Sequence, residues 1–230
     1  MNDQLPYTDL LVDPLSKVKY RCHLPQAQAP KRLLILLHGV GSNETHVRHL
    51  AKGQDADTLV LLTQGPLQLG AAQFAWFRVN FTPEGPKINV QETEQARQVL
   101  STFVKSVQAQ FKIRPQETLI AGFSQGGIMS ASLALTQPAL VRGFAVLSGR
   151  ILPEISPFIA PKNELAHLHG FIAHGEHDQT LLPMWAKKAD ECLNEHGIEH
   201  WYKTYPIAHE VSEDVKVDFT AWSKLCFGLS

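Results

Sequence analysis

The chain has 230 residues, of which 44% are hydrophobic and 19% are charged, and its formal net charge at pH 7 is -1. This length and composition are typical of one globular α/β domain, so we expect residues 1–230 to form a single domain with a sizeable core. The near-zero charge leaves no excess of basic side chains to neutralise a phosphate backbone or an anionic membrane surface. Nucleic acid is therefore not an expected partner.

The N-terminus and the cysteines bear on the cellular compartment. Residues 1–6 lack the basic start and apolar run of a signal peptide, and no segment approaches the ~18 apolar residues of a membrane span. Cys22, Cys192 and Cys226 are an odd number of cysteines without CxxC spacing, which favours a reducing compartment. We expect a cytoplasmic protein with no integral membrane association.

Hydrophobic patterns predict strands that alternate with helices. Residues 18–24 predict an antiparallel edge strand. Continuous apolar runs, typical of central parallel strands covered on both faces, lie at residues 32–37, 59–62, 118–122, 143–147 and 170–174. Helices are predicted at residues 90–111, 128–135, 183–196 and 212–225, and an alternating strand at 201–205. The alternation predicts an α/β fold with a mostly parallel central sheet and helices on both faces.

Two segments depart from this alternation. Residues 63–89 and 152–168 are interrupted by prolines or glycines and carry no sustained strand or helix pattern. Long excursions of this kind in compact domains often cover a functional site. We expect both segments to shape a pocket.

A candidate nucleophile lies in the sequence Gly-Phe-Ser-Gln-Gly-Gly at residues 122–127. A buried strand runs directly into Ser124, and a helix of small residues starts immediately after it. In such an elbow the serine hydroxyl projects above the sheet edge, and Gly122 and Gly126 prevent clashes between strand and helix. A bare G-x-S-x-G pattern occurs by chance, but the strand before and the helix after it favour a serine nucleophile.

A serine hydroxyl needs a base and a carboxylate that orients the base. Asp178 is the best acid, because it follows the apolar strand that ends at residue 174 and so lies at the carboxyl edge of the sheet. Glu176 and Asp190 are weaker candidates in the same region, while Glu154, after an earlier strand, is a serious competitor. Of the 11 histidines, only His209 follows both the acid and the last strand, which makes it the predicted base.

The oxyanion of an acyl-transfer intermediate needs two N–H donors. One is the N–H of Gln125, the residue after the nucleophile. The loop at residues 38–41, with sequence His-Gly-Val-Gly, ends the first central strand and predicts the second donor at Val40, because the flanking glycines allow close approach to the substrate.

Together these residues resemble the phospholipase/carboxylesterase family, which includes acyl-protein thioesterases and lysophospholipases. The resemblance spans nearly the whole chain. It rests on an LHGxG loop at residues 36–41, a GFSQGG elbow at 122–127, an HGxxD acid loop at 174–178 followed by Leu182-Pro183, and a Trp-Phe pair at 76–77. GFSQGG is the most specific of these motifs.

The resemblance implies an α/β-hydrolase fold and a carboxylesterase, thioesterase or lysophospholipase that uses Ser124, Asp178 and His209 as its triad. It assigns the oxyanion donors to Val40 and Gln125, agreeing with the interpretation from the residues alone. No cofactor or metal is implied. The substrate is a small ester or an acylated molecule, and a homodimer is a further suggestion of the family.

The substrate contacts rest mainly on the resemblance. Trp76, Phe77 and Leu182 are candidates for the pocket wall, with ordinary core packing as the alternative for each. Two departures from the family pattern lie nearby: Arg78 replaces an acidic residue, and Ala208 replaces the glycine before the histidine. Both bear on acyl specificity rather than on the catalytic groups.

Two other functions are weighed against the serine esterase. A metal hydrolase would use the closely spaced histidine pairs, but HExxH is absent and the serine elbow would have no role. A non-catalytic binding protein of the same fold is the second alternative, since fold does not imply function. Such a protein usually lacks a triad member, and all three candidates are present here.

Overall fold

A computed structural model describes residues 7–23, 29–82 and 85–229. Within these ranges, eight strands form the main sheet in the order β1-β2-β4-β3-β9-β10-β11-β12, parallel from β4 to β12 and antiparallel at β1 and β2. The strands are β1 (Leu11–Val12), β2 (Lys19–His23), β3 (Arg32–Leu37), β4 (Thr58–Gln64), β9 (Thr118–Phe123), β10 (Gly143–Leu147), β11 (His169–Gly175) and β12 (Glu199–Tyr205). The predicted mostly parallel sheet is confirmed.

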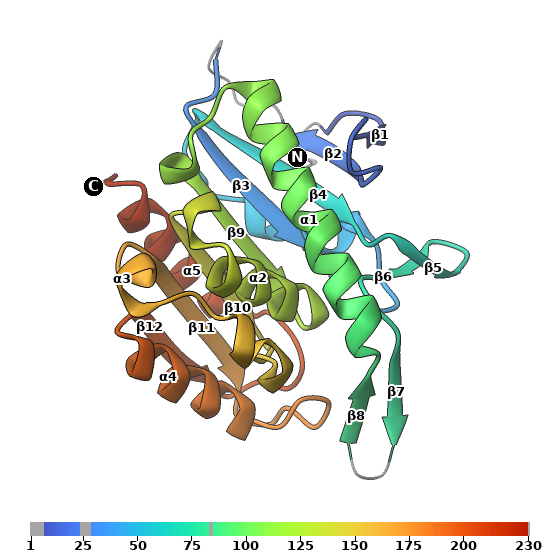
Figure 1. Ribbon diagram of the computed structural model, residues 1–230, viewed down its shortest axis with the longest axis vertical. Coiled ribbons are helices and arrows are strands. Elements are labelled where there is room, and N and C mark those ends of the chain that lie inside the picture. Colours follow the sequence, from blue (N-terminus) through green and yellow to red (C-terminus); the bar gives the residue numbers. More distant parts are fainter. Residues whose placement is uncertain (1–6, 24–28, 83–84, 230) are drawn as a thin grey trace.

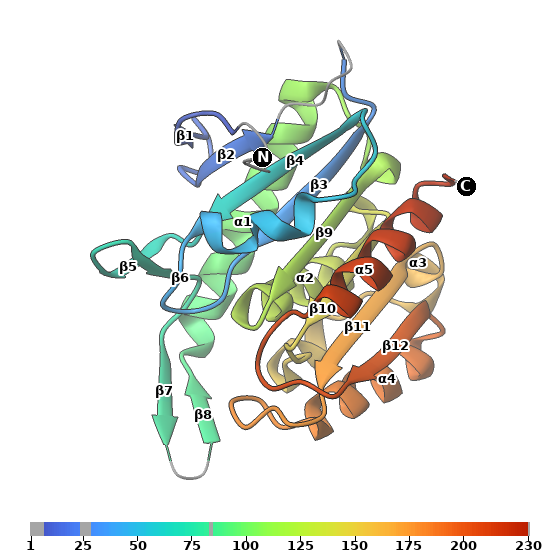
Figure 2. The ribbon, with the colours of Figure 1, turned by 180° about the vertical axis from the view of Figure 1, so that it is seen from behind.

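Helices cover both faces of the sheet (Figures 1 and 2). One face carries α1 (Val90–Phe111), α2 (Gln125–Thr136), α3 (Lys162–Leu165) and α4 (Met184–His196). The other carries α5 (Glu213–Cys226) and a 3₁₀ helix over Glu44–Ala51. Side chains of β3 alternate between these layers: Leu33 and Ile35 pack toward α1 and α2, while Leu34 and Leu36 pack toward α5. Two covered faces explain why the strand is apolar from Leu33 to Leu37.

The segment at residues 63–89 forms two hairpins instead of an irregular loop. They pair β5 (Leu67–Gly70) with β6 (Gln73–Ala75), and β7 (Val79–Thr82) with β8 (Gly85–Ile88). The β7–β8 hairpin projects beyond the end of the sheet (Figure 1). The segment at 152–168 holds a 3₁₀ helix over Pro153–Phe158 and the short helix α3.

Two elements differ from the sequence prediction. The predicted edge strand, β2, is the second strand of the sheet, because the two-residue β1 pairs outside it with Leu11 opposite Tyr20. A strand of two residues is too short to show a period. The second difference is a 3₁₀ helix at Glu44–Ala51, where the sequence pattern predicted no helix or strand. It begins after Asn43, whose side chain accepts a hydrogen bond from the N–H of Thr45. Two further 3₁₀ turns cover Pro115–Glu117 and Pro138–Leu140.

The membrane prediction can be compared with the helices of the structure. In the described ranges, no helix combines the length and the apolar character needed to cross a membrane.

Candidate active site

Ser124 lies in a sharp turn between β9 and α2. Its backbone has φ 54° and ψ -116°, a strained conformation for a residue with a side chain. The neighbouring glycines are required by close backbone approaches: a Cβ on Gly122 would lie 2.2 Å from the carbonyl carbon of Gly126, and one on Gly126 would lie 2.1 Å from the carbonyl oxygen of Leu37. The elbow is thereby packed directly against the end of β3.

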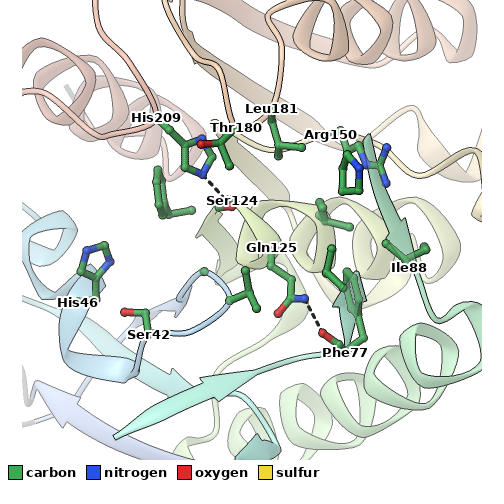
Figure 3. A pocket seen from close by; sticks show the side chains of 16 residues that line it. Ser42, His46, Phe77, Ile88, Ser124, Gln125, Arg150, Thr180, Leu181 and His209 are labelled. Carbon is green, nitrogen blue, oxygen red and sulfur yellow. Dashed lines mark hydrogen bonds between the residues drawn. The ribbon is translucent and has the colours of Figure 1, made fainter. Parts of the chain in front are cut away.

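The structure brings Ser124, His209 and Asp178 into one hydrogen-bonded chain. Figure 3 shows the contact between His209 and Ser124. Nε2 of His209 lies 3.0 Å from Oγ of Ser124, and Nδ1 of His209 lies 2.7 Å from Oδ2 of Asp178. Asp178 is fully buried, and its Oδ1 accepts hydrogen bonds from the N–H groups of Thr180 at 2.8 Å and Leu181 at 2.9 Å. These backbone donors stabilise the ionised carboxylate and fix its orientation.

The rival acids lie away from the serine. Glu154 is exposed on the 3₁₀ helix after β10. Glu176 accepts a hydrogen bond from the hydroxyl of Thr204, and Asp190 pairs with His200 at 2.8 Å. Asp178 is therefore the acid that the fold brings to His209.

Close backbone contacts hold the loop that carries His209 against the acid loop at residues 174–178. A Cβ on Gly175 would lie 2.2 Å from the carbonyl oxygen of Ala208, so only glycine allows the two loops to approach this closely. The N–H of His177 also donates to the carbonyl of Ile207 over 3.0 Å. Ala208, the departure from the family pattern, thus contributes its backbone to this contact.

His174 is a component of the site that the sequence interpretation did not assign. Its Nε2 lies 2.8 Å from the carbonyl oxygen of Leu181 and 3.3 Å from Oδ2 of Asp178. Burial lowers the pKa of His174, so the ring is neutral, and two acceptors at Nε2 require that nitrogen to carry the proton. His174 therefore contacts the same carboxylate oxygen of Asp178 as His209 does, and helps to hold the acid in place. Its position in the HGxxD motif was the available signal.

The loop after β3 holds the N–H of Val40. Nδ1 of the buried His38 lies 2.7 Å from the carbonyl oxygen of Gly39, and its Nε2 accepts the N–H of Gly65 over 2.9 Å. Burial lowers the pKa of His38 to about 4, so the ring is neutral with its proton on Nδ1. In a trans peptide the N–H points opposite to the carbonyl. The bond to Gly39 therefore turns the N–H of Val40 away from the His38 ring.

Gln125 presents the second predicted donor. As the first residue of α2, it has an N–H without an acceptor inside the helix. Both Gln125 and Val40 line the cavity that contains Ser124. The positive end of the α2 dipole lies at the same point, which favours developing negative charge.

The cavity beside Ser124 has a volume of about 300 Å³. The β7–β8 hairpin supplies Val79, Pro86 and Ile88 to its wall, so the segment at 63–89 does shape the pocket. Among the described residues, none from 152–168 lines it, which contradicts the prediction for that segment.

The three predicted substrate contacts have different positions. Phe77 lines the cavity. Trp76 is buried behind the loop after β3, where its Nε1–H donates to the carbonyl of His38 over 3.1 Å. Leu182 is 47% exposed, and it is the neighbouring Leu181 that lines the cavity. Neither Trp76 nor Leu182 is a lining residue.

The remaining sequence features lie outside this cavity. Arg78, the second departure from the family, forms an ion pair with Glu92 at the start of α1. The cysteines Cys22, Cys192 and Cys226 are free thiols. In the part of the chain that the structure describes, no group of three or more His, Cys, Asp or Glu side chains is arranged to hold a metal ion.

Comparison with known proteins identifies the family. A sequence model described as Phospholipase/Carboxylesterase matches residues 24–220. The chain belongs to the phospholipase/carboxylesterase family. This membership confirms the resemblance, the α/β-hydrolase fold and the carboxylic ester hydrolase activity that the sequence predicts.

Individual relatives are distant in sequence but similar over most of their length. An acyl-protein thioesterase 1 of Kluyveromyces lactis is 24% identical over 203 residues, covering 81% of this chain and 88% of the relative. A probable carboxylesterase, SOBER1-like, of Arabidopsis thaliana is 27% identical over 209 residues, covering 84% and 78%. The crystal structure of a carboxylesterase from Mesorhizobium loti superposes with a TM-score of 0.78 at 22% identity, covering 94% of this chain and 98% of that one.

Proposed function

We propose that this ester hydrolase uses Ser124 as nucleophile, His209 as general base and Asp178 as the acid that orients the base. The observation that carries the proposal is the hydrogen-bonded chain from Oγ of Ser124 through both ring nitrogens of His209 to the buried carboxylate of Asp178. Nucleophile, base and orienting acid in hydrogen-bond contact are the geometric signature of this mechanism.

In the proposed reaction, Oγ of Ser124 attacks the ester carbonyl while Nε2 of His209 takes the hydroxyl proton. The tetrahedral oxyanion accepts hydrogen bonds from the N–H groups of Val40 and Gln125. Its collapse forms an acyl-serine and expels the alcohol, which receives the proton from His209. Water then attacks the acyl-serine by the same steps and releases the acid. Throughout, Asp178 stabilises the charged imidazolium without taking its proton.

The substrate in this proposal is a small carboxylic ester or acylated molecule. Phe77 and the β7–β8 hairpin form an apolar wall of the cavity. The cavity volume of about 300 Å³ is enough for a short acyl group. We assign Trp76 to support of the oxyanion loop, through its bond to His38, and Leu182 to the exposed rim. Relatives named as a thioesterase and as carboxylesterases make thioesters the second substrate class to test.

The test is hydrolysis of p-nitrophenyl esters of increasing acyl length, and of the matching thioesters, by the wild type and by Ser124→Ala, with and without EDTA. Turnover by the wild type and its loss in Ser124→Ala are expected. Activity that survives in Ser124→Ala would refute the triad, and activity that EDTA removes would point to a metal hydrolase. A wild type inert toward esters and thioesters alike would favour the non-catalytic binding protein.

We also propose that residues 1–230 act as one domain in the cytoplasm. Core clusters on the two faces of one sheet support the first statement, and three free cysteines support the second. A homodimer stays a prediction, for which Phe158, an exposed aromatic side chain, is one candidate contact. Light scattering after size exclusion, on the wild type and Phe158→Ser, tests the assembly.

A further inference from the structure

Arg150 places a positive charge in the wall of the catalytic cavity. It follows β10 and lines the same cavity as Ser124, yet only 6% of its surface is exposed. The preceding Gly149 explains the position, because a Cβ there would lie 3.0 Å from the carbonyl oxygen of Ser124. In Figure 3, Arg150 and Ile88 lie on one side of Ser124. The backbone at Gly149 is therefore packed against the nucleophile elbow, and this contact sets the position from which the Arg150 side chain enters the cavity wall.

The guanidinium has no acceptor in the described part of the protein. No carboxylate or carbonyl there accepts a hydrogen bond from Arg150, and its Nε is buried without a partner. The guanidinium instead lies against the indole of Trp185, whose ring centroid is 4.7 Å from Cζ. Such a contact with the ring face supplies none of the hydrogen-bond acceptors that the guanidinium N–H groups need.

A buried and unpaired charge is unfavourable, so its presence in a cavity calls for an explanation. Burial lowers the pKa of Arg150, and the nearby Glu154 carboxylate offsets only part of this effect. The other titratable side chains that line the cavity are His46 and His209, and neither supplies a negative charge. A carboxylate on a bound molecule would supply a counter-ion inside the cavity.

We propose that Arg150 binds a carboxylate carried by the substrate, so that the preferred substrates are esters bearing a second, ionised carboxyl group. The fork of N–H donors of a guanidinium matches the two oxygens of one carboxylate. Apolar neighbours such as Ile88 and Leu181 exclude water from the pair and strengthen it. This inference rests on the proposed function for its reaction, but the binding of a carboxylate can be measured separately.

The test compares charged esters with neutral analogues of the same shape. Monomethyl glutarate and methyl glutaramate differ only in a carboxylate against an amide on the acyl half. The pair 4-acetoxybutanoate and 4-acetoxybutanamide places the same difference on the alcohol half. Acid release in a pH-stat gives kcat/KM for each, and the ratio of charged to neutral substrate is the readout.

For one of the two pairs, the wild type should favour the charged ester, which identifies the half of the substrate that carries the carboxylate. Arg150→Met should lower that ratio about tenfold or more, as expected for loss of a hydrogen-bonded charge pair. Arg150→Lys should retain part of it. Lys188→Met is the matched control: Lys188 contacts the same Trp185 ring, at 4.6 Å, but does not line the cavity, so the ratio should not change.

Two results would overturn the inference. One is a ratio that Arg150→Met leaves unchanged in both pairs; the other is a wild type that disfavours both charged esters. Calorimetric titration of glutarate into the Ser124→Ala protein, with and without Arg150→Met, gives an answer that needs no turnover. If neither protein binds glutarate, the inference fails while ester hydrolysis stands. If the wild type hydrolyses no ester but glutarate binding depends on Arg150, the proposed function fails and the carboxylate site stands.

Discussion

The side chain of Gln125 holds the main chain of Phe77, because its Nε2–H donates to the Phe77 carbonyl oxygen over 2.7 Å (Figure 3). Its Oε1 also accepts the N–H of Trp76 over 2.8 Å. The residue after the proposed nucleophile therefore ties the elbow to the pocket wall. All of these groups are buried, so the amide satisfies backbone groups that water cannot reach.

Replacing this amide by a carboxylate should separate the elbow from the wall. In Gln125→Glu, the donor to Phe77 becomes a second acceptor, while the bond from Trp76 can persist. We expect a loss of about 1 to 3 kcal/mol in the free energy of unfolding, measured by urea titration, and altered acyl-length preference. Gln116→Glu, at an exposed position, is the control. Equal midpoints for the two variants would show that the bridge contributes nothing.

The carboxylate of Asp178 should be needed for the tautomer of His209. Since Oδ1 accepts two backbone N–H groups, the amide nitrogen of Asp178→Asn would replace Oδ2 and face Nδ1 of His209. The imidazole would then carry its proton on Nε2, where it cannot accept the proton of Ser124.

We expect kcat to fall about 10⁴-fold in Asp178→Asn with a small change in KM. The kinetics of p-nitrophenyl ester hydrolysis give both values. Asp190→Asn is the matched control, because Asp190 pairs with His200 outside the cavity. A similar small loss of kcat in both variants would rule out this role for Asp178.

Much of the fold was predictable because buried parallel strands have an unmistakable pattern. The runs at residues 32–37 and 143–147 match β3 and β10 to the residue, and α1 begins and ends where its apolar spacing predicted. The hairpins in 63–89 could not be predicted, since their strands are short and partly exposed. In addition, β6 is held by backbone hydrogen bonds between Phe74 and the distant residues Gly41 and Ser42.

The candidate site also has a part that the sequence predicts and a part that it does not. Strand ends and loops at one edge of the sheet were enough to bring Ser124, Asp178 and His209 together in the prediction, because topology alone sends them there. The direction of individual side chains was not predictable. Leu181 rather than Leu182 faces the cavity because its N–H binds Asp178, and the charge of Arg150 in the wall has no sequence signature.

The neutral ring of His38 should make the protein less stable in mild acid. Its pKa is about 4 in the folded protein and 6.5 when exposed, so the unfolded chain binds more protons between these two values. Stability should therefore be complete above pH 6.5 and fall by up to about 3 kcal/mol as the pH approaches 4.

Urea titrations of the wild type and His38→Asn across this range measure the effect. The substituted side chain is an amide that does not titrate, so the variant should lose stability less steeply with falling pH than the wild type. Parallel pH dependences would assign the acid sensitivity to other groups.

Gly126 should tolerate no side chain, because the elbow lies directly on the strand that carries the oxyanion loop. In Gly126→Ala, the new Cβ would lie 2.1 Å from the carbonyl oxygen of Leu37, and backbone on both sides must move apart. That movement separates Ser124 from Val40, so kcat should fall even where circular dichroism shows a folded protein.

Gly197→Ala is the control: its φ of +72° strains alanine by about 1 to 2 kcal/mol, but no atom lies within 4 Å of the added Cβ. We expect Gly197→Ala to lose stability and keep its kcat, whereas Gly126→Ala loses both; equal kcat values in the two folded variants would show that the elbow can shift without disturbing catalysis.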